Sequence, residues 1–421
     1  MGTGPSTKET TLHHYRDPLV DLLTRDKEVD FPGIIIAGTS DEQEHKAFVA
    51  SRIGALLESM RADGVIVSID SWGNCHIDFT AVIENIGERG IPLVGVSFVG
   101  TQAAFVVSNS YMTNSIIDLN KTSVGDETCV MGQNTASGLD ALKALAVLKN
   151  KIKKKYPEKN FQVKEEKRLR RLILRSYAVN RVEEAGRTGL NGNTLLLDPQ
   201  GLVAAALSGL GKDFPQVKDV QVKIIRPDER KVFVNSILDF SPVAAKAAGR
   251  PGEGISHALA GAQVMLTAVE ENGFQPANIG SAHGRLDEHV VFGLCGTPAQ
   301  DDYIIHIDVL LKEGGGRTRE GIMAAHQACD LIVHKIRQDL RGLPKNLAAA
   351  SRELWDTVTQ GGCKIALVKI VSGLGCLYDT ALFPDEPGGY IGSKSIMDSC
   401  NNVQVVLSAN EHRDGVIRSL S

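Results

Sequence analysis

The sequence predicts an α/β protein in which an N-terminal domain with a parallel βαβ sheet precedes a second domain of the α+β type. Three observations support this fold class. Between residues 33 and 110, short β-branched runs alternate with amphipathic stretches, as they do in βαβ units. After residue 169, strands appear among turns, and one of them, at 303–309, alternates in polarity. The chain also has 42 glycines and only 5% aromatic residues, which fits many tight turns.

The N-terminal domain is expected to span residues 1–150. Its predicted strands lie at 33–37, 65–69 and 93–96, and its predicted helices at 42–60, 79–87 and 137–148. Because the strands are continuous apolar runs, we expect helices on both faces of the sheet. Polar residues follow two of the strands, at 71–74 and 97–101. Open parallel sheets bind ligands at this edge, so a cleft is predicted there.

Residues 151–166 are expected to form a basic linker, within a basic run that contains Pro157. The run contains only two aromatic residues, Tyr156 and Phe161, and we favour a solvated surface over a nucleic-acid site. The second domain is expected to span 167–421. Its predicted elements are strands at 172–177, 232–238, 264–266, 303–309, 365–371 and 403–407, and a helix with one apolar stripe at 318–340.

Composition excludes several classes of protein. The 46 basic and 50 acidic residues leave a formal charge of -4, so no overall positive field exists for nucleic acid or an anionic membrane. No apolar run approaches the roughly 20 residues that span a bilayer, and polar residues follow Met1, so we expect a cytoplasmic protein. The seven cysteines form no CxxC pair, which predicts reduced thiols, and no metal-ligand spacing is present, so no metal is expected.

One cysteine lies in an unusual setting. Cys129 follows Thr128 in the segment VGDETCVMGQNT at 124–135, with Asp126 and Glu127 beside it. A free thiol is only a few per cent thiolate at neutral pH, so a reactive role needs a nearby base or positive charge. From the residues alone, a structural thiol is the favoured interpretation.

Polar residues at the expected cleft are the other candidates for substrate binding or proton transfer. They are His13, His14, Arg16, Asp70, His76 and Asp78. Each precedes a predicted helix or follows a predicted strand, so it can act as a proton donor or, with Arg16, as a clamp for a carboxylate. Capping and surface roles are the alternatives. Histidines of the second domain, such as His306 and His412, are not placed among the catalytic candidates.

Several long strings resemble a known family, the reductases for D-proline and for glycine, sarcosine and betaine of amino-acid-fermenting anaerobes. Those similar to the later part of the D-proline-specific proprotein are GTGPSTKETTLHHYRDP at 2–18, DSWGNCHID at 70–78 and RGIP at 89–92. Residues from about 167 to 421 resemble an accessory protein of the same system. The strings there are GEGISH at 252–257, IHIDV at 305–309 and NEHRDG at 410–415. The chain therefore resembles a fusion of the two.

The resemblance implies a chemistry for Cys129. In that family the proprotein cuts itself before a cysteine, which becomes a pyruvoyl group, and the Thr128–Cys129 bond best resembles the cut. The resulting ketone can react with the amine of proline and weaken the bond between nitrogen and the α-carbon. A partner subunit with selenocysteine or cysteine, and a dithiol or thioredoxin-like electron donor, are implied. The chain is thus expected to be a subunit of an oligomeric D-proline reductase complex that forms 5-aminovalerate.

Two alternatives stay open. The substrate can be another amino acid, such as glycine, sarcosine, betaine or a hydroxylated proline. The chain can also be a non-catalytic assembly or ligand-binding subunit in which Cys129 remains an ordinary thiol.

Overall fold

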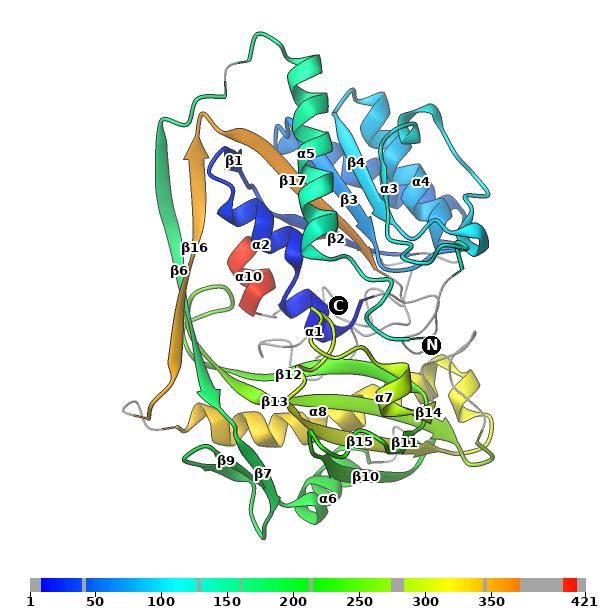
Figure 1. Cartoon of the computed structure of the whole chain (residues 1–421), viewed down its shortest axis with the longest axis vertical. Helices are drawn as coiled ribbons and strands as arrows, with labels where there is room; N and C mark the ends of the chain where they lie inside the picture. The colour runs from blue at the N-terminus through cyan, green and yellow to red at the C-terminus, as the bar shows by residue number, and fades with distance from the viewer. Residues whose placement is uncertain are drawn as a thin grey trace.

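The computed structural model describes residues 9–39, 43–126, 130–159, 161–211, 215–273, 284–343, 347–371 and 404–414. Two sheets with their helices lie one above the other, and two long strands run between them (Figure 1). The first sheet is mainly parallel and the second is mixed, so the predicted α/β class is confirmed. No helix in the described ranges is long and apolar enough to cross a membrane.

The first sheet has the strand order β18-β2-β17-β3-β4-β5, with β1 paired to β17. Its strands are β1 (Val29–Asp30), β2 (Ile34–Gly38), β3 (Gly64–Ile69), β4 (Leu93–Ser97), β5 (Ile116–Asp118), β17 (Cys363–Val371) and β18 (Val405–Leu407). All pairs are parallel except β18 with β2. The central strands are apolar runs buried on both faces, as parallel strands require.

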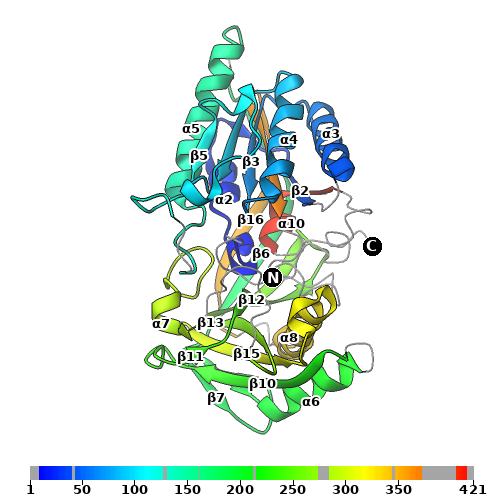
Figure 2. The same cartoon turned by 90° about the vertical axis from the view of Figure 1, so that its right-hand side faces the viewer.

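Helices cover both faces of this sheet (Figure 2). One face packs against α2 (Pro18–Arg25) and α5 (Gly138–Lys155), and the other against α3 (Gln43–Ser59) and α4 (Cys75–Glu88). Helix α5 begins with a capping box, in which Ser137 and Asp140 exchange side-chain and backbone hydrogen bonds.

The linker between the two regions is shorter than the expected 151–166, because regular structure extends into it from both sides. Helix α5 continues to Lys155, because Leu148 and Ile152 extend its buried face and its last turn is basic. The next strand, β6, already begins at Glu165. The helix expected at 79–87 likewise starts earlier, at Cys75.

The C-terminal strands were assigned to the wrong sheet. We expected residues 365–371 and 403–407 to end the second domain, but β17 lies between β2 and β3, with Leu367 opposite both Ile34 and Ile66. A strand buried on both faces fits the centre of a parallel sheet. The apolar run predicted the strand, but sequence distance concealed its partners.

The second sheet has the order β10-β15-β13-β6-β16, with β12 paired to β13. Its strands are β6 (Glu165–Ala178), β10 (Val217–Ile225), β12 (Ile237–Ala248), β13 (Gly254–Glu270), β15 (Tyr303–Leu311) and β16 (Ala350–Gln360). Strand β13 is parallel to β15 and β6, and the other pairs are antiparallel. Helices α6 (Pro199–Leu210) and α8 (Arg319–Arg341) share one core with this sheet.

Smaller elements complete the second region. They are β7 (Arg181–Glu184), β8 (Gly189–Asn191), β9 (Thr194–Leu197), β11 (Phe233–Val234), β14 (Gly284–Arg285), α7 (Leu286–His289) and the 3-10 turn η3 (Gly315–Arg317). In the first region, 3-10 turns lie at η1 (Thr101–Ala103) and η2 (Ser110–Met112).

Strands β6 and β16 form an antiparallel ribbon that joins the two regions (Figure 1). At the first region, β16 passes through Gly361 into β17. Gly361 has φ +80, and a Cβ there would lie 2.1 Å from the Gln162 carbonyl oxygen, so only glycine fits this turn. The ribbon therefore delivers the chain directly into the centre of the parallel sheet.

Two short helices fill the junction between the regions, α1 (Thr11–Tyr15) and α10 (Ala409–Asp414) (Figure 1). The α1 segment also bonds to the second region. The Thr11 backbone N–H donates to Asp239 Oδ1 of β12 at 2.9 Å, and Thr10 Oγ1 donates to the Gly296 carbonyl at 2.7 Å. The two ends of the described chain thus meet between the sheets.

Candidate functional site

Two of the predicted candidates lie at the carboxyl edge of the parallel sheet. Asp70 directly follows β3, and its backbone N–H donates to the Ile370 carbonyl of β17 at 3.2 Å. His76, in the first turn of α4, has Nε2 2.8 Å from Ser97 Oγ at the end of β4. The sequence placed these polar groups at the edge where open parallel sheets bind ligands, and the structure puts them there.

Asp78 is engaged within the first region. Its carboxylate forms a buried ion pair with Lys46 of α3, which ties α3 to α4. The His76 ring packs 4.5 Å from the Phe105 ring. Asp78 therefore fixes α4 to α3, and His76 packs α4 against the segment that follows β4.

His13 and His14 lie in a different place, on α1, inside a buried polar group that we call the Lys369 cluster. Its members, all less than 5% exposed, are Glu9, His13, His14, Asp17, Lys369 and His412. They come from the N-terminal segment, β17 and α10. The structure therefore separates His13 and His14 from His76 and Asp78, because Lys369 shares a face with the α2 and α5 core whereas α4 covers the opposite face.

Lys369 is the centre of this cluster. Its ammonium contacts Asp17 Oδ2 and lies 3.0 Å from Glu9 Oε2. Glu9 also meets both histidines, with Oε1 3.3 Å from His13 Nε2 and Oε2 3.5 Å from His14 Nε2. A lysine on a buried strand is thereby surrounded by acidic partners.

The charges of the cluster are set by competition between burial and pairing. Burial lowers the pKa of Lys369, but the charges of Asp17 and Glu9 outweigh it and raise that pKa above its usual value. Burial raises the pKa of both carboxyl groups, and Lys369 reverses this, so the pKa of each is lowered. All three groups are therefore charged near neutral pH.

Two of the histidines are neutral under the same conditions. Burial, reinforced by the Lys369 charge, lowers the pKa of His14 well below its usual value. Burial also lowers the pKa of His412 to about 3. Neutral imidazoles can accept a proton or bind a metal.

Three members of the cluster have the composition of a metal site. One ligand atom each from His14, Asp17 and His412 lie within 4.8 Å of one another. Two imidazoles and a carboxylate suit a first-row transition metal. However, Asp17 Oδ1 accepts the N–H of Leu19 at 2.7 Å and Oδ2 contacts Lys369, so both oxygens already have partners. As described, the cluster is a closed network of ion pairs and not an open coordination site.

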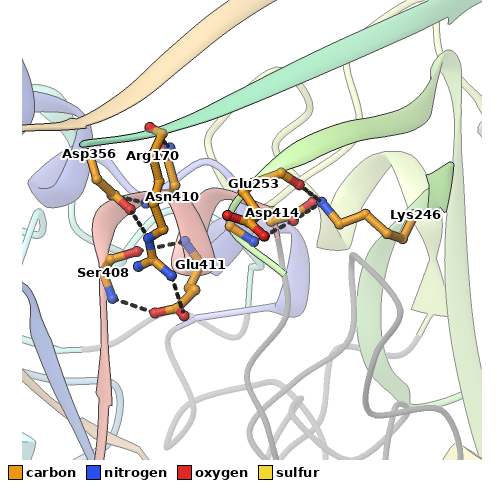
Figure 3. Close-up of polar contacts among 9 residues, drawn as sticks. Arg170, Lys246, Glu253, Asp356, Ser408, Asn410, Glu411 and Asp414 are labelled. Carbon is orange, nitrogen blue, oxygen red and sulfur yellow. Dashed lines mark hydrogen bonds and ion pairs between the residues drawn. The ribbon is translucent and has the colours of Figure 1, made fainter. Parts of the chain in front are cut away.

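Helix α10 is fixed to the β6–β16 ribbon by a second set of polar contacts (Figure 3). Arg170 of β6 donates from Nε to Asp356 Oδ2 and from Nη1 to Glu411 Oε1, both at 3.0 Å. The Asn410 backbone N–H donates to Asp356 Oδ1 at 2.9 Å. These contacts position the helix that supplies His412 to the Lys369 cluster.

The other end of α10 meets the second sheet (Figure 3). Asp414 contacts Lys246 and Ser256 and accepts the Gly252 backbone N–H at 2.8 Å. Burial raises the pKa of Asp414 and lowers the pKa of Lys246, although each partner opposes that shift. Burial therefore outweighs pairing here, the reverse of the result at Lys369.

Arg16 does not join the histidines. It is exposed just after α1 and lines a pocket together with Arg352 and Arg413, and the lining of this pocket does not include His13 or His14. Arg16 and the two histidines thus lie in different surroundings, and the roles in substrate binding that the sequence analysis expects for them stay predictions.

Thr128, Cys129 and Glu127 lie outside the described residues, but the chain on both sides is anchored. Upstream, Thr101 Oγ1 donates to Asp126 Oδ1 at 2.6 Å and the Thr101 N–H donates to the Gly125 carbonyl at 2.8 Å. Downstream, the Met131 N–H donates to the His289 carbonyl at 2.9 Å. The upstream flank thus adjoins the loop after β4, and the downstream flank adjoins the second region.

Sequence reasoning missed four members of the cluster, Glu9, Asp17, Lys369 and His412. One signal was present. Lys369 is the one charged residue in the apolar run IALVKIV at 365–371, and a buried lysine requires carboxylate partners. Nothing in the sequence indicated that those partners would come from residues 9–17.

Comparison with known proteins confirms the resemblance found in the motifs. Residues 3–104 match the family of glycine/sarcosine/betaine reductase component B subunits. Over 259 residues the chain is 32% identical to the D-proline reductase proprotein of Acetoanaerobium sticklandii, which is 61% of this chain and 40% of that protein. The chain thus spans well under half the length of this relative. No solved structure matches the present chain.

Proposed function

We propose that this chain is a subunit of an amino-acid reductase of the D-proline type, and that its Thr128–Cys129 bond is cleaved to give a pyruvoyl group. The observation that carries the proposal is the 32% identity to a D-proline reductase proprotein over 259 residues. The family match at residues 3–104 supports a reductase of this class. The reaction opens the proline ring to 5-aminovalerate.

Processing can be written as a balanced sequence. The Cys129 thiolate attacks the Thr128 carbonyl carbon, and the peptide nitrogen leaves to give a thioester and a free amine. Removal of the Cys129 α-proton then breaks the bond between Cβ and sulfur, which leaves dehydroalanine and a thiocarboxylate on Thr128. Water replaces the nitrogen of the dehydroalanine as ammonia, and a ketone remains. No oxidant is required.

The flanking residues support this site. Asp126 is the candidate base on the upstream side, because Thr101 Oγ1 holds its carboxylate at 2.6 Å. A Cβ on Gly100 would lie 1.7 Å from the Gly125 carbonyl oxygen, so this pair of loops can approach each other only with glycine at 100. The upstream flank therefore has a fixed position beside the carboxyl edge of the sheet, where ligands of open α/β sheets bind.

The ketone, once formed, supplies an electron-withdrawing group that activates the amino acid. Opening proline to 5-aminovalerate breaks one bond between carbon and nitrogen and consumes two electrons and two protons. A dithiol supplies both when it is oxidised to a disulfide. We propose that a partner subunit with selenocysteine or cysteine delivers them, so the working enzyme is a complex.

Intact-mass measurement of the purified chain under reducing, anaerobic conditions tests the processing step. We expect fragments of 128 and 293 residues, the larger one blocked at its N-terminus. Cys129→Ala should give only the full-length chain. The matched control is Cys295→Ala, a half-buried thiol elsewhere in the protein, which should process like the wild type.

Two results would contradict the proposal. One is a wild-type chain that stays full-length when it is co-expressed with its reductase partner and the complex reduces D-proline. The other is unchanged reduction by the Cys129→Ala complex, which would leave the chain an assembly or ligand-binding subunit.

The family match also supports another class of substrate, since residues 3–104 match subunits of reductases for glycine, sarcosine and betaine. Reduction of each of these by the same complex, in parallel with D-proline, separates the two assignments. We expect D-proline to be reduced fastest, because the longer identity is to the D-proline reductase proprotein.

A further inference from the structure

A pocket between the two regions is lined by more positive than negative side chains. It has a volume of about 250 Å³ and lies where α1, α2, the β6–β16 ribbon, β13 and α10 meet. Three arginines from distant parts of the sequence line it, Arg16, Arg352 and Arg413. The single carboxylate among the lining residues is Asp21, so the lining carries a net charge of about +2.

Asp21 cannot neutralise these groups, because it is shared. Its Oδ1 lies 3.3 Å from Arg352 Nη2 and 3.7 Å from Arg413 Nη2. Its Oδ2 also pairs at 3.1 Å with Arg25, which does not line the pocket. One carboxylate therefore serves three guanidinium groups, and Arg16 has no ion pair within the described ranges.

Arg413 is the most buried of the three arginines. Its side chain is 9% exposed, and its Nε has no hydrogen-bond partner within the described ranges. Burial lowers the pKa of Arg413 to about 10, an effect that the charges of Asp21 and Asp356 only partly oppose. A buried guanidinium with an unsatisfied N–H donor destabilises the folded protein unless an anion accepts that hydrogen bond and balances the charge.

Another part of the pocket lining, which we call its apolar wall, consists of hydrophobic residues. It is formed by Leu174, Ala258, Leu259, Ala260 and Leu354. An inorganic anion would leave this wall unused, whereas an acid with a short hydrocarbon body would contact it. The volume is below the roughly 300–1,000 Å³ of pockets for drug-sized ligands, which limits the occupant to a few carbon atoms.

We infer that this pocket binds a small organic carboxylate, with the carboxylate held by Arg16, Arg352 and Arg413 and the hydrocarbon body packed on the Leu174–Leu259–Leu354 wall. The planar guanidinium fork matches the geometry of a carboxylate, and paired hydrogen bonds of this kind are among the strongest in proteins. The inference does not rest on the proposed function, because binding here requires neither a ketone nor an electron donor.

Isothermal titration calorimetry of the full chain with valerate tests the site. Valerate is a five-carbon acid without an amine, so it cannot react with a ketone derived from Cys129, and the result is independent of processing. We expect valerate to bind and valeramide, which has the same body without the charge, to bind at least tenfold more weakly. Inorganic phosphate should also bind at least tenfold more weakly, because it cannot contact the apolar wall.

Arg16→Gln is the principal variant, because Arg16 is exposed and its loss leaves the packing intact. It should weaken valerate binding about tenfold or more. Arg25→Gln is the matched control, since Arg25 pairs with the same Asp21 outside the pocket, and it should change affinity less than about twofold. Arg413→Lys, which keeps the charge but loses the fork, should also weaken binding.

Three outcomes would overturn the inference. Valerate and valeramide could bind equally, phosphate could bind as tightly as valerate, or Arg16→Gln and Arg25→Gln could have the same effect. The first would remove the charge from the recognition, the second would make the site one for anions in general, and the third would place the binding elsewhere.

Discussion

The parallel sheet and the junction beneath it are held together by different forces. In the sheet, strands such as β2 and β3 are buried along their full length, and helices cover both faces with apolar side chains. In the junction, α1 and α10 bring buried carboxylates, lysines and histidines together. Apolar burial is insensitive to pH, whereas buried ion pairs fail when either partner changes its charge. The junction is therefore the part of the protein that single substitutions and pH should disturb most.

The junction itself contains two unequal lysine sites. Lys369 has two carboxylate partners, and pairing outweighs burial, so its pKa is raised. Lys246 has one, Asp414, and burial outweighs pairing, so its pKa is lowered. A second acid, and not burial alone, therefore decides whether the pKa of a buried lysine is raised or lowered.

The largest effect should come from removing the cation of the Lys369 cluster. Lys369→Met leaves Glu9 and Asp17 buried without a counter-charge, and we expect a loss of about 3–5 kcal/mol in the free energy of unfolding. Denaturant unfolding measures it. The control is Lys364→Met on the same strand, a one-third exposed lysine 3.8 Å from Asp30, which should cost less than about 1 kcal/mol. Equal losses for the two variants would mean that the cluster contributes no more than a surface pair.

The next effect is a loss of stability in mild acid through His412. The pKa of this histidine is lowered by folding, so its contribution is fully present above about pH 6.5 and is lost as the pH falls toward about 3. The loss amounts to about 1.4 kcal/mol per pH unit, or about 2 kcal/mol between pH 6.5 and 5. His412→Asn should remove that part of the slope, whereas His45→Asn on α3 should retain it. A wild-type slope in the His412 variant would contradict the buried neutral imidazole.

The smallest effect should come from the Lys246 site. Asp414→Asn keeps the shape of the side chain and an acceptor for the Gly252 N–H, and burial already disfavours the charge of Asp414. We expect the free energy of unfolding to fall by about 1 kcal/mol at neutral pH. Asp228→Asn, at an exposed position, serves as the control and should leave unfolding unchanged. A loss as large as that of Lys369→Met would remove the distinction between the two lysine sites.

The sequence predicted the local structure well where hydrophobic pattern decides it. Continuous apolar runs marked β2, β3 and β4, and the apolar stripe of α8 marked a helix that begins at Arg319 and ends at Arg341. The position of β17 between β2 and β3 was missed. A strand's pattern records that it is buried on two faces, but it does not record which strands are its neighbours.

For the candidate site, too, the sequence predicted individual residues but not their distant partners. His13, His14 and Asp70 were identified because their motifs combine polar groups with the expected ends of helices and strands. The ion pairs that surround the two histidines were not, because they join residue 9 or 17 to residue 369 and such pairs have no sequence period. The local sequence pattern therefore did not indicate that these distant residues meet in the fold.

Cleavage at Thr128–Cys129 is tested by the carbonyl chemistry of the fragment that begins at residue 129. Purified protein is treated with phenylhydrazine under reducing, anaerobic conditions, and the products are measured by mass spectrometry. We expect the 293-residue fragment to gain one hydrazone at its N-terminus, while Cys129→Ala remains a full-length chain without a label. An unlabelled full-length chain in a complex that reduces D-proline, or a fragment that begins with an unmodified cysteine, would contradict it.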